Sequence, residues 1–421
     1  MGGRRRLGRD FGRLWAAYAV SAYGSGLGFG ALPLIAVLAL RAGPAEVSAL
    51  SAVGPAMGAL IALPLAPWVE FRRKRPVMVA MDLVRFAAMA TIPVAYAFGL
   101  LGFVHLLVVS AVLAAAKIAF NAASGAFLKA LVPPDDLLVA NARFESTHWS
   151  SVAVGPPLGG AATGLFGPVV TVVADALSYL LSALGIAAIR GREEDPRPRP
   201  AGEQPLQAGE QPLRAGALPD GWRHLLGDPT LRALYLNQIL VSGLIMATEP
   251  LLAVLLLRRL EFPPWQYGLA FALPCLGGLV GSRLAPRVVA RFGRPAVFRT
   301  AGTLRAVWLI GLAFVRPGVV GLVTVIAVEL AIVVNMSLYT PVLAACRLER
   351  TPKHLVARTL TAWSVGQQAS TALCTALGGL LATVTGPRTA LMVAGLLILA
   401  TPPLLPRRDR MTPRTAPEPA A

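Results

Sequence analysis

The stretch LAPWVEFRRKRP, Leu65 to Pro76, passes from apolar chain into four consecutive cations, and a related stretch, LAPRVVARFGRP, occupies Leu284 to Pro295. The letters Leu, Ala, Pro, Val, Arg, Arg and Pro recur in the same order at an offset of 219 residues. An apolar segment that ends in a cluster of cations is typical of a transmembrane helix reaching the cytoplasm. Its recurrence predicts that the chain contains a repeat.

The composition also favours a membrane protein. Of the 421 residues, 55% are hydrophobic and only 14% are charged, and the mean hydropathy is +0.63. A soluble domain carries about 25% charged residues. The net charge of +18 could suggest a nucleic-acid-binding protein, but the cations lie in short breaks between apolar runs and not on one face of a soluble module. We therefore expect a lipid bilayer, and no nucleic acid, as the partner.

Twelve apolar segments are long enough to be spans, since a helix needs roughly 20 apolar residues to cross the hydrocarbon. They are near residues 14–40, 46–69, 76–98, 103–130, 138–165, 168–189, 231–257, 265–290, 295–315, 318–345, 355–384 and 387–405. The cations of the intervening breaks alternate between many and few along all twelve spans. By the positive-inside rule, both termini and the central connection are expected in the cytoplasm. The protein itself is expected in the cell inner (plasma) membrane.

Further matches support the repeat. LWAAY at Leu14 resembles LRALY at Leu231, PLIAVL at Pro33 resembles PLLAVL at Pro250, and a GG-x6-GP pattern begins at both Gly159 and Gly378. Chance recurrence of small apolar residues is a poor explanation for matches at nearly one offset. Because six spans is an even number, both halves enter from the same side, as in transporters that rock one half against the other.

The predicted fold is thus an all-α membrane protein with twelve transmembrane helices in two parallel six-helix repeats. The expected domains are an N-terminal bundle over 1–190, a cytoplasmic linker over 191–229, a C-terminal bundle over 230–406 and a cytoplasmic tail over 407–421. The linker is rich in Pro, Gly, Glu and Arg and has little to bury, apart from a short amphipathic turn, GWRHLLGDP, before the seventh span.

With these features the sequence resembles the major facilitator superfamily (MFS fold) over nearly its whole length, and more narrowly its bacterial drug- and siderophore-exporter branch. The family's loop signature after spans two and eight reads roughly Gly-x-x-x-Asp-Arg-x-Gly-Arg-Lys. The first copy here keeps an acid and the cations but replaces the leading Gly and the first Arg, while the second has no acid. The resemblance assigns a cytoplasmic gating loop to Glu70, Arg73, Lys74 and Arg75 in the first copy and to Arg291, Gly293 and Arg294 in the second.

The charges of this loop can act in two ways. Glu70 can pair with cations or a helix N-terminus of the other half when the cytoplasmic side is shut. Asp82 and Arg85 are three residues apart on the third span and can join that network. The alternative is that the cations only hold the loop in the cytoplasm.

Within the fifth span, GPPLGG resembles the end of the family's antiporter signature, although its two earlier glycines are replaced by Ala142 and Ser151. Small residues allow close helix contact and Pro kinks a helix, so a contact between spans five and eight would seal the protein against leak. Ordinary close packing is the alternative. The motif residues are Gly155, Pro156, Gly159 and Gly160.

Charged residues inside a bilayer are candidates for function. Lys117 and Glu329 fall near the midplane and Asp175 and Glu249 in the outer third, and Asn121 shares the helix face of Lys117. We expect these five to line the substrate and coupling cavity, with Lys117 facing Glu329. Glu249 and Glu329 are the leading proton carriers, because a desolvated carboxylate can exchange a proton near neutral pH. A buried helix–helix tie is the alternative for each.

The predicted function is a secondary active transporter, a monomer that exports a hydrophobic or amphipathic small molecule such as a drug, antibiotic or siderophore against protons. The alternatives are an importer of a small metabolite, or a sensor, scramblase or membrane enzyme on the same scaffold. We expect that the protein is not an enzyme, because its four histidines are scattered along the sequence and form no catalytic triad. No cofactor or metal is expected: there is no ATP-binding loop, and the three cysteines form no metal-binding pattern.

Overall fold

The structure, a computed structural model, describes residues 8–28, 30–70, 72–133, 136–189, 218–352 and 355–405. This part of the chain is helical throughout and contains no strand. Most of the predicted linker and the whole of the predicted tail lie outside the described residues.

The first half of the chain forms six membrane-length segments. The first of them is interrupted between residues 28 and 30, so that two helices, α1 and α2, occupy one span. The elements are α1 (Arg9–Leu27), α2 (Ala31–Leu38), α3 (Pro44–Glu70), α4 (Lys74–Ala97), α5 (Phe103–Leu131), α6 (Leu137–Phe166) and α7 (Pro168–Ala187).

The second half forms six segments in the same order after a short helix, α8 (Leu218–Gly227). Two of its spans change helical type along their length, and one is followed by a short turn. The elements are α9 (Pro229–Val254) with η3 (Leu255–Arg259), α10 (Pro264–Phe292), α11 (Arg294–Val307) with η4 (Trp308–Phe314), α12 (Val319–Glu349), α13 (Val356–Thr385), and α14 (Pro387–Leu399) with η6 (Pro402–Leu404).

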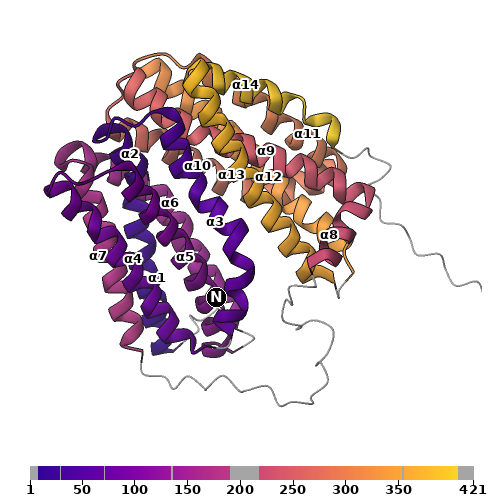
Figure 1. The fold of residues 1–421 in the computed structure, drawn as a ribbon. Helices are drawn as coiled ribbons and strands as arrows, with labels where there is room; N and C mark the ends of the chain where they lie inside the picture. Colours follow the sequence, from indigo (N-terminus) through magenta and orange to yellow (C-terminus); the bar gives the residue numbers. More distant parts are fainter. Residues whose placement is uncertain are drawn as a thin grey trace, which may run out of the picture.

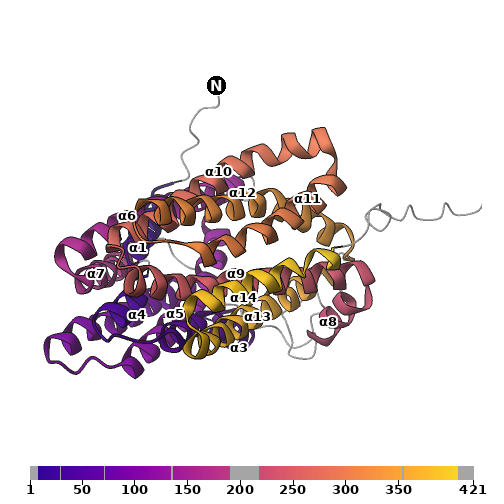
Figure 2. The same ribbon diagram turned by 90° about the horizontal axis from the view of Figure 1, so that it is seen from above.

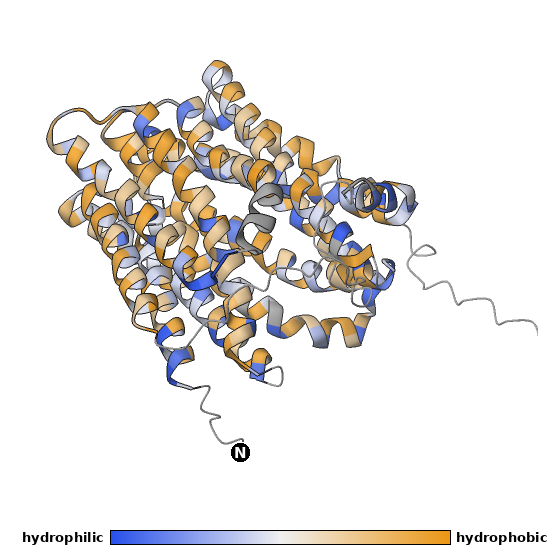
Figure 3. Cartoon of the chain, turned by 60° about the horizontal axis from the view of Figure 1, so that its bottom comes forward, coloured by the Kyte–Doolittle hydropathy of each residue, from blue (hydrophilic) through white to orange (hydrophobic). Residues whose placement is uncertain are grey.

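These twelve segments confirm the predicted fold class. Within the described residues, nine are long and apolar enough to cross a membrane, or ten when α10, which is bent by 48°, counts as one span. The other two, α6 and α13, are 30 residues long but contain more polar side chains. Figure 3 shows hydrophobic residues over much of the helical part of the chain.

Large apolar side chains cover the outside of the molecule. Val104, Leu181 and Leu373 are 70%, 57% and 60% exposed, and many further Leu and Val residues are similar. Exposed apolar surface of this extent is unfavourable in water but is the expected surface of a protein in lipid. The chain is therefore a multi-pass membrane protein.

The two halves lie side by side (Figure 1), with α1 to α7 in one bundle and α9 to α14 in the other. Here the N-terminal face is the end of the molecule where α1 begins, and the far face is the end where α3 and α10 begin. Between the halves, α3 packs against α13 and α6 against α10. Figure 2 shows these two pairs along opposite edges of the interface.

Two glycines at equivalent positions of the repeat allow this contact. A Cβ at Gly160 of α6 would lie 2.6 Å from the carbonyl oxygen of Pro264, in the first turn of α10. A Cβ at Gly379 of α13 would lie 2.3 Å from the Cβ of Ser48, in the first turns of α3. Each half therefore presents a glycine to the start of a helix in the other half, at the far face.

The repeat is also visible in the backbone. Gly167, which precedes α7, has φ 83° and ψ 165°, and Gly386, which precedes α14, has φ 87° and ψ 158°. Only glycine adopts this conformation without strain. Each glycine is followed by a proline at the first helical position, where the missing N–H is not needed. The repeated GG-x6-GP pattern thus encodes the same turn in both halves.

A hydrogen-bonded contact joins the halves at the far face. Arg258, in η3, donates from Nη1 to the carbonyl oxygens of Arg41 and Ala42 at 3.1 and 3.2 Å. Arg41 itself has a φ of 52°, in the left-handed region. Together with the glycine contacts, this hydrogen bonding closes the far face, while in Figure 1 the two bundles diverge toward the N-terminal face.

The predicted amphipathic turn before the seventh span is the helix α8. Asp220 pairs with Arg358 of α13 at 3.0 Å, and Trp222 packs edge-on against Tyr235 of α9 with 5.6 Å between ring centroids. Leu225 is fully buried. The helix is therefore docked on the second half.

The interface glycines give a stability test. Gly160→Ala and Gly379→Ala each place a methyl group against atoms of the other half, and such overpacking costs about 1–3 kcal/mol. Gly164→Ala in the same helix as Gly160 meets nothing within 4 Å and is expected to be neutral or slightly stabilising. Thermal unfolding of the purified protein in detergent should show lower midpoints for the first two variants only. Equal midpoints for all three would contradict the close contact.

Candidate functional site

The first bundle contains a pocket of about 580 Å³ between α1, α4, α5, α6 and α7. This volume suits a drug-sized molecule. Its lining mixes aromatic, aliphatic and polar side chains: Tyr18, Ser21, Ala22, Ser25, Gly26, Gly28, Leu32, Arg85, Met89, Leu113, Lys117, Phe120, Asn121, His148, Ser151, Val152, Pro156, Asp175 and Tyr179. Three of the five predicted cavity residues, Lys117, Asn121 and Asp175, lie in this pocket.

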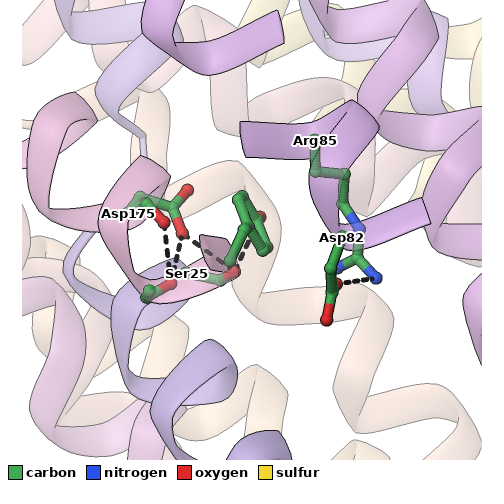
Figure 4. A network of polar contacts seen from close by, with 6 residues as sticks. Ser25, Asp82, Arg85 and Asp175 are labelled. Atoms are coloured by element: carbon green, nitrogen blue, oxygen red, sulfur yellow. Dashed lines mark hydrogen bonds and ion pairs between the residues drawn. The ribbon is translucent and has the colours of Figure 1, made fainter. Parts of the chain in front are cut away.

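Asp175 of α7 is held by hydroxyl groups at the broken first span. Ser25 Oγ donates to Asp175 Oδ1 at 3.2 Å and shares a hydrogen bond of 2.9 Å with Tyr179 (Figure 4). Ser178 Oγ lies 3.4 Å from the same carboxylate oxygen. A Cβ at Gly28 would lie 2.9 Å from Asp175 Oδ2, so glycine is needed where the helix breaks beside the carboxylate. Asp175 is 5% exposed.

Arg85 and Asp82 of α4 form a buried ion pair. Arg85 Nη2 lies 2.9 Å from Asp82 Oδ1, and Asp82 is fully buried (Figure 4). The guanidinium also stacks on the rings of Phe120 and Tyr179, at 4.5 and 4.8 Å from their centroids. The contacts of this pair lie inside the bundle, where Arg85 lines the pocket and Asp82 neutralises it. A part for the two residues in the cytoplasmic loop network stays a prediction.

Lys117 of α5 is the exposed cation of the pocket. Within the described residues it makes no ion pair or hydrogen bond, although Arg85 and Asp175 act on it electrostatically. Asn121, one turn further along α5, is also exposed and lines the same pocket.

Glu249 of α9 and Glu329 of α12 lie in the second bundle and act on one another electrostatically. Glu249 also acts on the buried Tyr267, and Glu329 on Cys275, both in α10. Neither carboxylate has a cation partner among the residues that the structure describes. We call Glu249 and Glu329 the acid pair.

The structure does not bring Lys117 and Glu329 together. The electrostatic partners of Lys117 are in its own bundle, and that of Glu329 is Glu249. The five predicted residues therefore fall into two sites, a pocket in the first half and the acid pair in the second.

The predicted loop residues lie at the N-terminal face, and the contacts described for Arg75 and Arg294 are within their own halves. Arg75 donates to the carbonyl oxygens of Ile186 and Ala187, which end α7. Arg294, its equivalent in the repeat, pairs with Glu349 at 2.6 Å.

Five further residues complete this predicted loop. Arg73 and Gly293 precede α4 and α11, Lys74 Nζ donates to the carbonyl oxygen of Arg72, and Arg291 stacks on Phe292. Glu70 ends α3, and its side chain lies outside the described residues.

The antiporter-like motif contacts two different helices. A Cβ at Gly155 or Gly159 would meet the backbone of Gly26 or Leu27 at 2.3 or 2.0 Å, so these glycines pack against α1. Gly160 packs against α10, and a Cβ at Gly268 of α10 would lie 2.3 Å from the carbonyl oxygen of Pro156. The expected contact between spans five and eight is present, but half of the motif belongs to the contact between spans five and one.

The sequence analysis missed Arg305 of α11, which is fully buried. Its Nη2 donates to Asn237 Oδ1 at 2.6 Å and its Nη1 to Gln238 Oε1 at 2.9 Å. The guanidinium lies 3.6 Å from the ring centroid of Tyr339. Arg305 and Tyr339 occupy nearly the repeat positions of Arg85 and Phe120, and this offset was the signal that could have identified them.

The substitution Arg305→Lys tests this network. Lys lacks the planar fork that reaches both amides, so Arg305→Lys leaves a buried amide oxygen without its donor, at a cost of about 1–3 kcal/mol. The midpoint of thermal unfolding should fall for this variant. Arg299→Lys, at an exposed position of the same helix, is the matched control and should leave the midpoint unchanged. A variant at 305 as stable as its control would show that the forked contacts contribute nothing.

Solved structures resemble this chain in fold. A bacterial homologue of the iron transporter ferroportin in an inward-facing state is 17% identical, with a TM-score of 0.73, over 94% of this chain and 98% of that one. The outward-facing state of such a homologue has the same identity and coverage but a TM-score of 0.59. The nucleoside transporter NupG is 9% identical, with a TM-score of 0.74, over 95% of this chain and all of that one.

No curated protein sequence matches the chain. The family model of the Major Facilitator Superfamily matches residues 14–355 and again residues 250–421. Its match covers both six-helix halves, which agrees with the repeat and the interface described above. The chain is therefore a transporter of the Major Facilitator Superfamily.

Proposed function

We propose that this transporter exports amphipathic small molecules in exchange for protons, as in the drug- and siderophore-exporter branch of its family. The observation that carries the proposal is the acid pair, two interacting carboxylates without a described cation partner, in the half opposite the pocket. The pocket volume and its mixed aliphatic and aromatic lining support an amphipathic substrate.

The two sites suggest separate roles, with the substrate bound in the pocket and the proton bound by the acid pair. Two carboxylates close together in a medium of low dielectric constant repel, so the loss of a proton from one affects the other. A proton bound to either Glu249 or Glu329 would be held more strongly when the pair is dry and would leave more easily when the pair meets water. Rocking the halves changes that access, and can therefore couple proton movement to the pocket.

The proposed topology determines the side from which the pocket would load. We place the protein in the inner membrane as a monomer. Its N-terminal face and both termini then lie on the cytoplasmic side. With the far face closed, the pocket would load from the cytoplasm. The glycine contacts and the Arg258 hydrogen bonds must then part to release the substrate outside, while Glu70 and the loop cations would close the cytoplasmic side. An importer would use the same parts in reverse, and the direction of the imposed gradient distinguishes the two.

Transport in vesicles tests the proposal. The probes are naphthalene-2-sulfonate, 2-naphthyltrimethylammonium and 2-naphthol, which share one aromatic body and differ in charge. In oriented proteoliposomes with an imposed pH gradient, at least one probe should accumulate against its gradient with counterflow of protons reported by an enclosed pH dye. Accumulation should vanish when the gradient is collapsed.

Substitution of the acid pair tests coupling separately. Glu249→Gln and Glu329→Gln mimic the protonated acid and cannot release a proton, so we expect gradient-driven accumulation to fall by about tenfold or more, while exchange of labelled for unlabelled probe persists. Glu261→Gln, in the exposed loop after η3, is the control and should behave as the unmodified protein. If both acid-pair variants remained gradient-driven, the carriers would lie elsewhere.

A further inference from the structure

We propose that the pocket of the first bundle selects substrates with an anionic group, which Lys117 binds while the apolar walls hold the rest of the molecule. The proposal rests on the transport function above and names its substrate class. Its basis is the difference between the pocket charges that have an ion-pair or hydrogen-bond partner and Lys117, which has none among the described residues.

Three of the charged groups at the pocket are already occupied. Asp82 neutralises Arg85 at 2.9 Å, two aromatic rings cover the guanidinium, and Arg85 as a whole is 6% exposed. Asp175 is 5% exposed and accepts a hydrogen bond from Ser25, with the hydroxyl of Ser178 3.4 Å from the same carboxylate oxygen. A cationic substrate would therefore have to displace these hydroxyl groups to reach the one carboxylate that lines the pocket.

Lys117 is in a different situation. It is exposed, lines the pocket near the middle of α5, and has no ion pair or hydrogen bond in the described ranges. A cation in the interior of a membrane protein is costly unless it is paired or hydrated. An anionic group would remove that cost by forming a charge-assisted hydrogen bond, the strong class of hydrogen bond. Asn121, one turn along the same face, offers an amide donor to the same group.

The remaining lining fits an apolar body. The pocket that Lys117 lines is also lined by the apolar side chains of Leu32, Met89, Leu113, Phe120 and Val152. A molecule with one anionic end and an aromatic or branched apolar portion would satisfy both parts of the pocket. Polar substrates without an apolar portion would bury little of this apolar surface and would therefore gain little binding free energy from it.

Equilibrium binding to the protein in lipid nanodiscs, without any gradient, tests this selectivity. Of the three naphthyl probes, naphthalene-2-sulfonate should bind about tenfold or more tightly than the trimethylammonium and the neutral compound, because a hydrogen bond to a charged group is worth roughly that factor. Lys117→Gln should remove this preference and leave binding of 2-naphthol unchanged, and Lys117→Arg should keep it.

Lys129, twelve residues further along α5 at its exposed end, provides the matched control. Lys129→Gln should bind all three probes like the unmodified protein. Tighter binding of the cationic probe would overturn the proposal, as would unchanged sulfonate binding by Lys117→Gln or an equal loss of all three probes. Because no gradient is present, these outcomes are independent of proton coupling, so selective binding without driven transport would refute the exporter function and leave the anion site standing.

Discussion

The close approach of backbones at Gly160 and Gly379 is the constraint on which the rest of this structure depends. In lipid the hydrophobic effect does not drive helices together, so association relies on van der Waals packing at small residues. The two glycines let α6 and α13 touch the first turns of α10 and α3. The contacts described at these two glycines are van der Waals contacts, so the halves can separate there without breaking a hydrogen bond that the structure describes.

Each half handles its buried charge differently. In the first, the cation of Arg85 is matched by Asp82 and covered by aromatic rings. In the second, Arg305 is held by two neutral amides whose nitrogen atoms donate elsewhere, Asn237 to the carbonyl oxygen of Thr401 and Gln238 to Ser242. The amide oxygens are thereby turned toward the guanidinium. The acid pair is a third arrangement of buried charge. Buried charges are costly in a medium of low dielectric constant, and they are typical of functional sites.

Much of the fold was predictable from the sequence, because the features that determine it are local. Apolar runs near 20 residues long define the spans, and the Gly-Pro pairs that precede α7 and α14 define identical turns. Partners across helices were not predictable, because they depend on the rotation of each helix about its axis. That rotation turns Asp82 and Arg85 inward, directs Gly155 and Gly159 to α1 and leaves Lys117 and Glu329 in separate sites. The site of Arg305 was not predictable from charges alone, because its partners Asn237 and Gln238 are neutral amides.

The far-face hydrogen bonds of Arg258 have a consequence for genetics. Their acceptors are carbonyl oxygens of the main chain at Arg41 and Ala42, and the arginine of that loop contributes its backbone and not its own guanidinium. No exchange of side chains at those two positions removes the acceptors. A loosened contact at the far face is therefore expected from changes at codon 258, which encodes the donor, whereas a change of side chain at codon 41 or 42 leaves both acceptors in place.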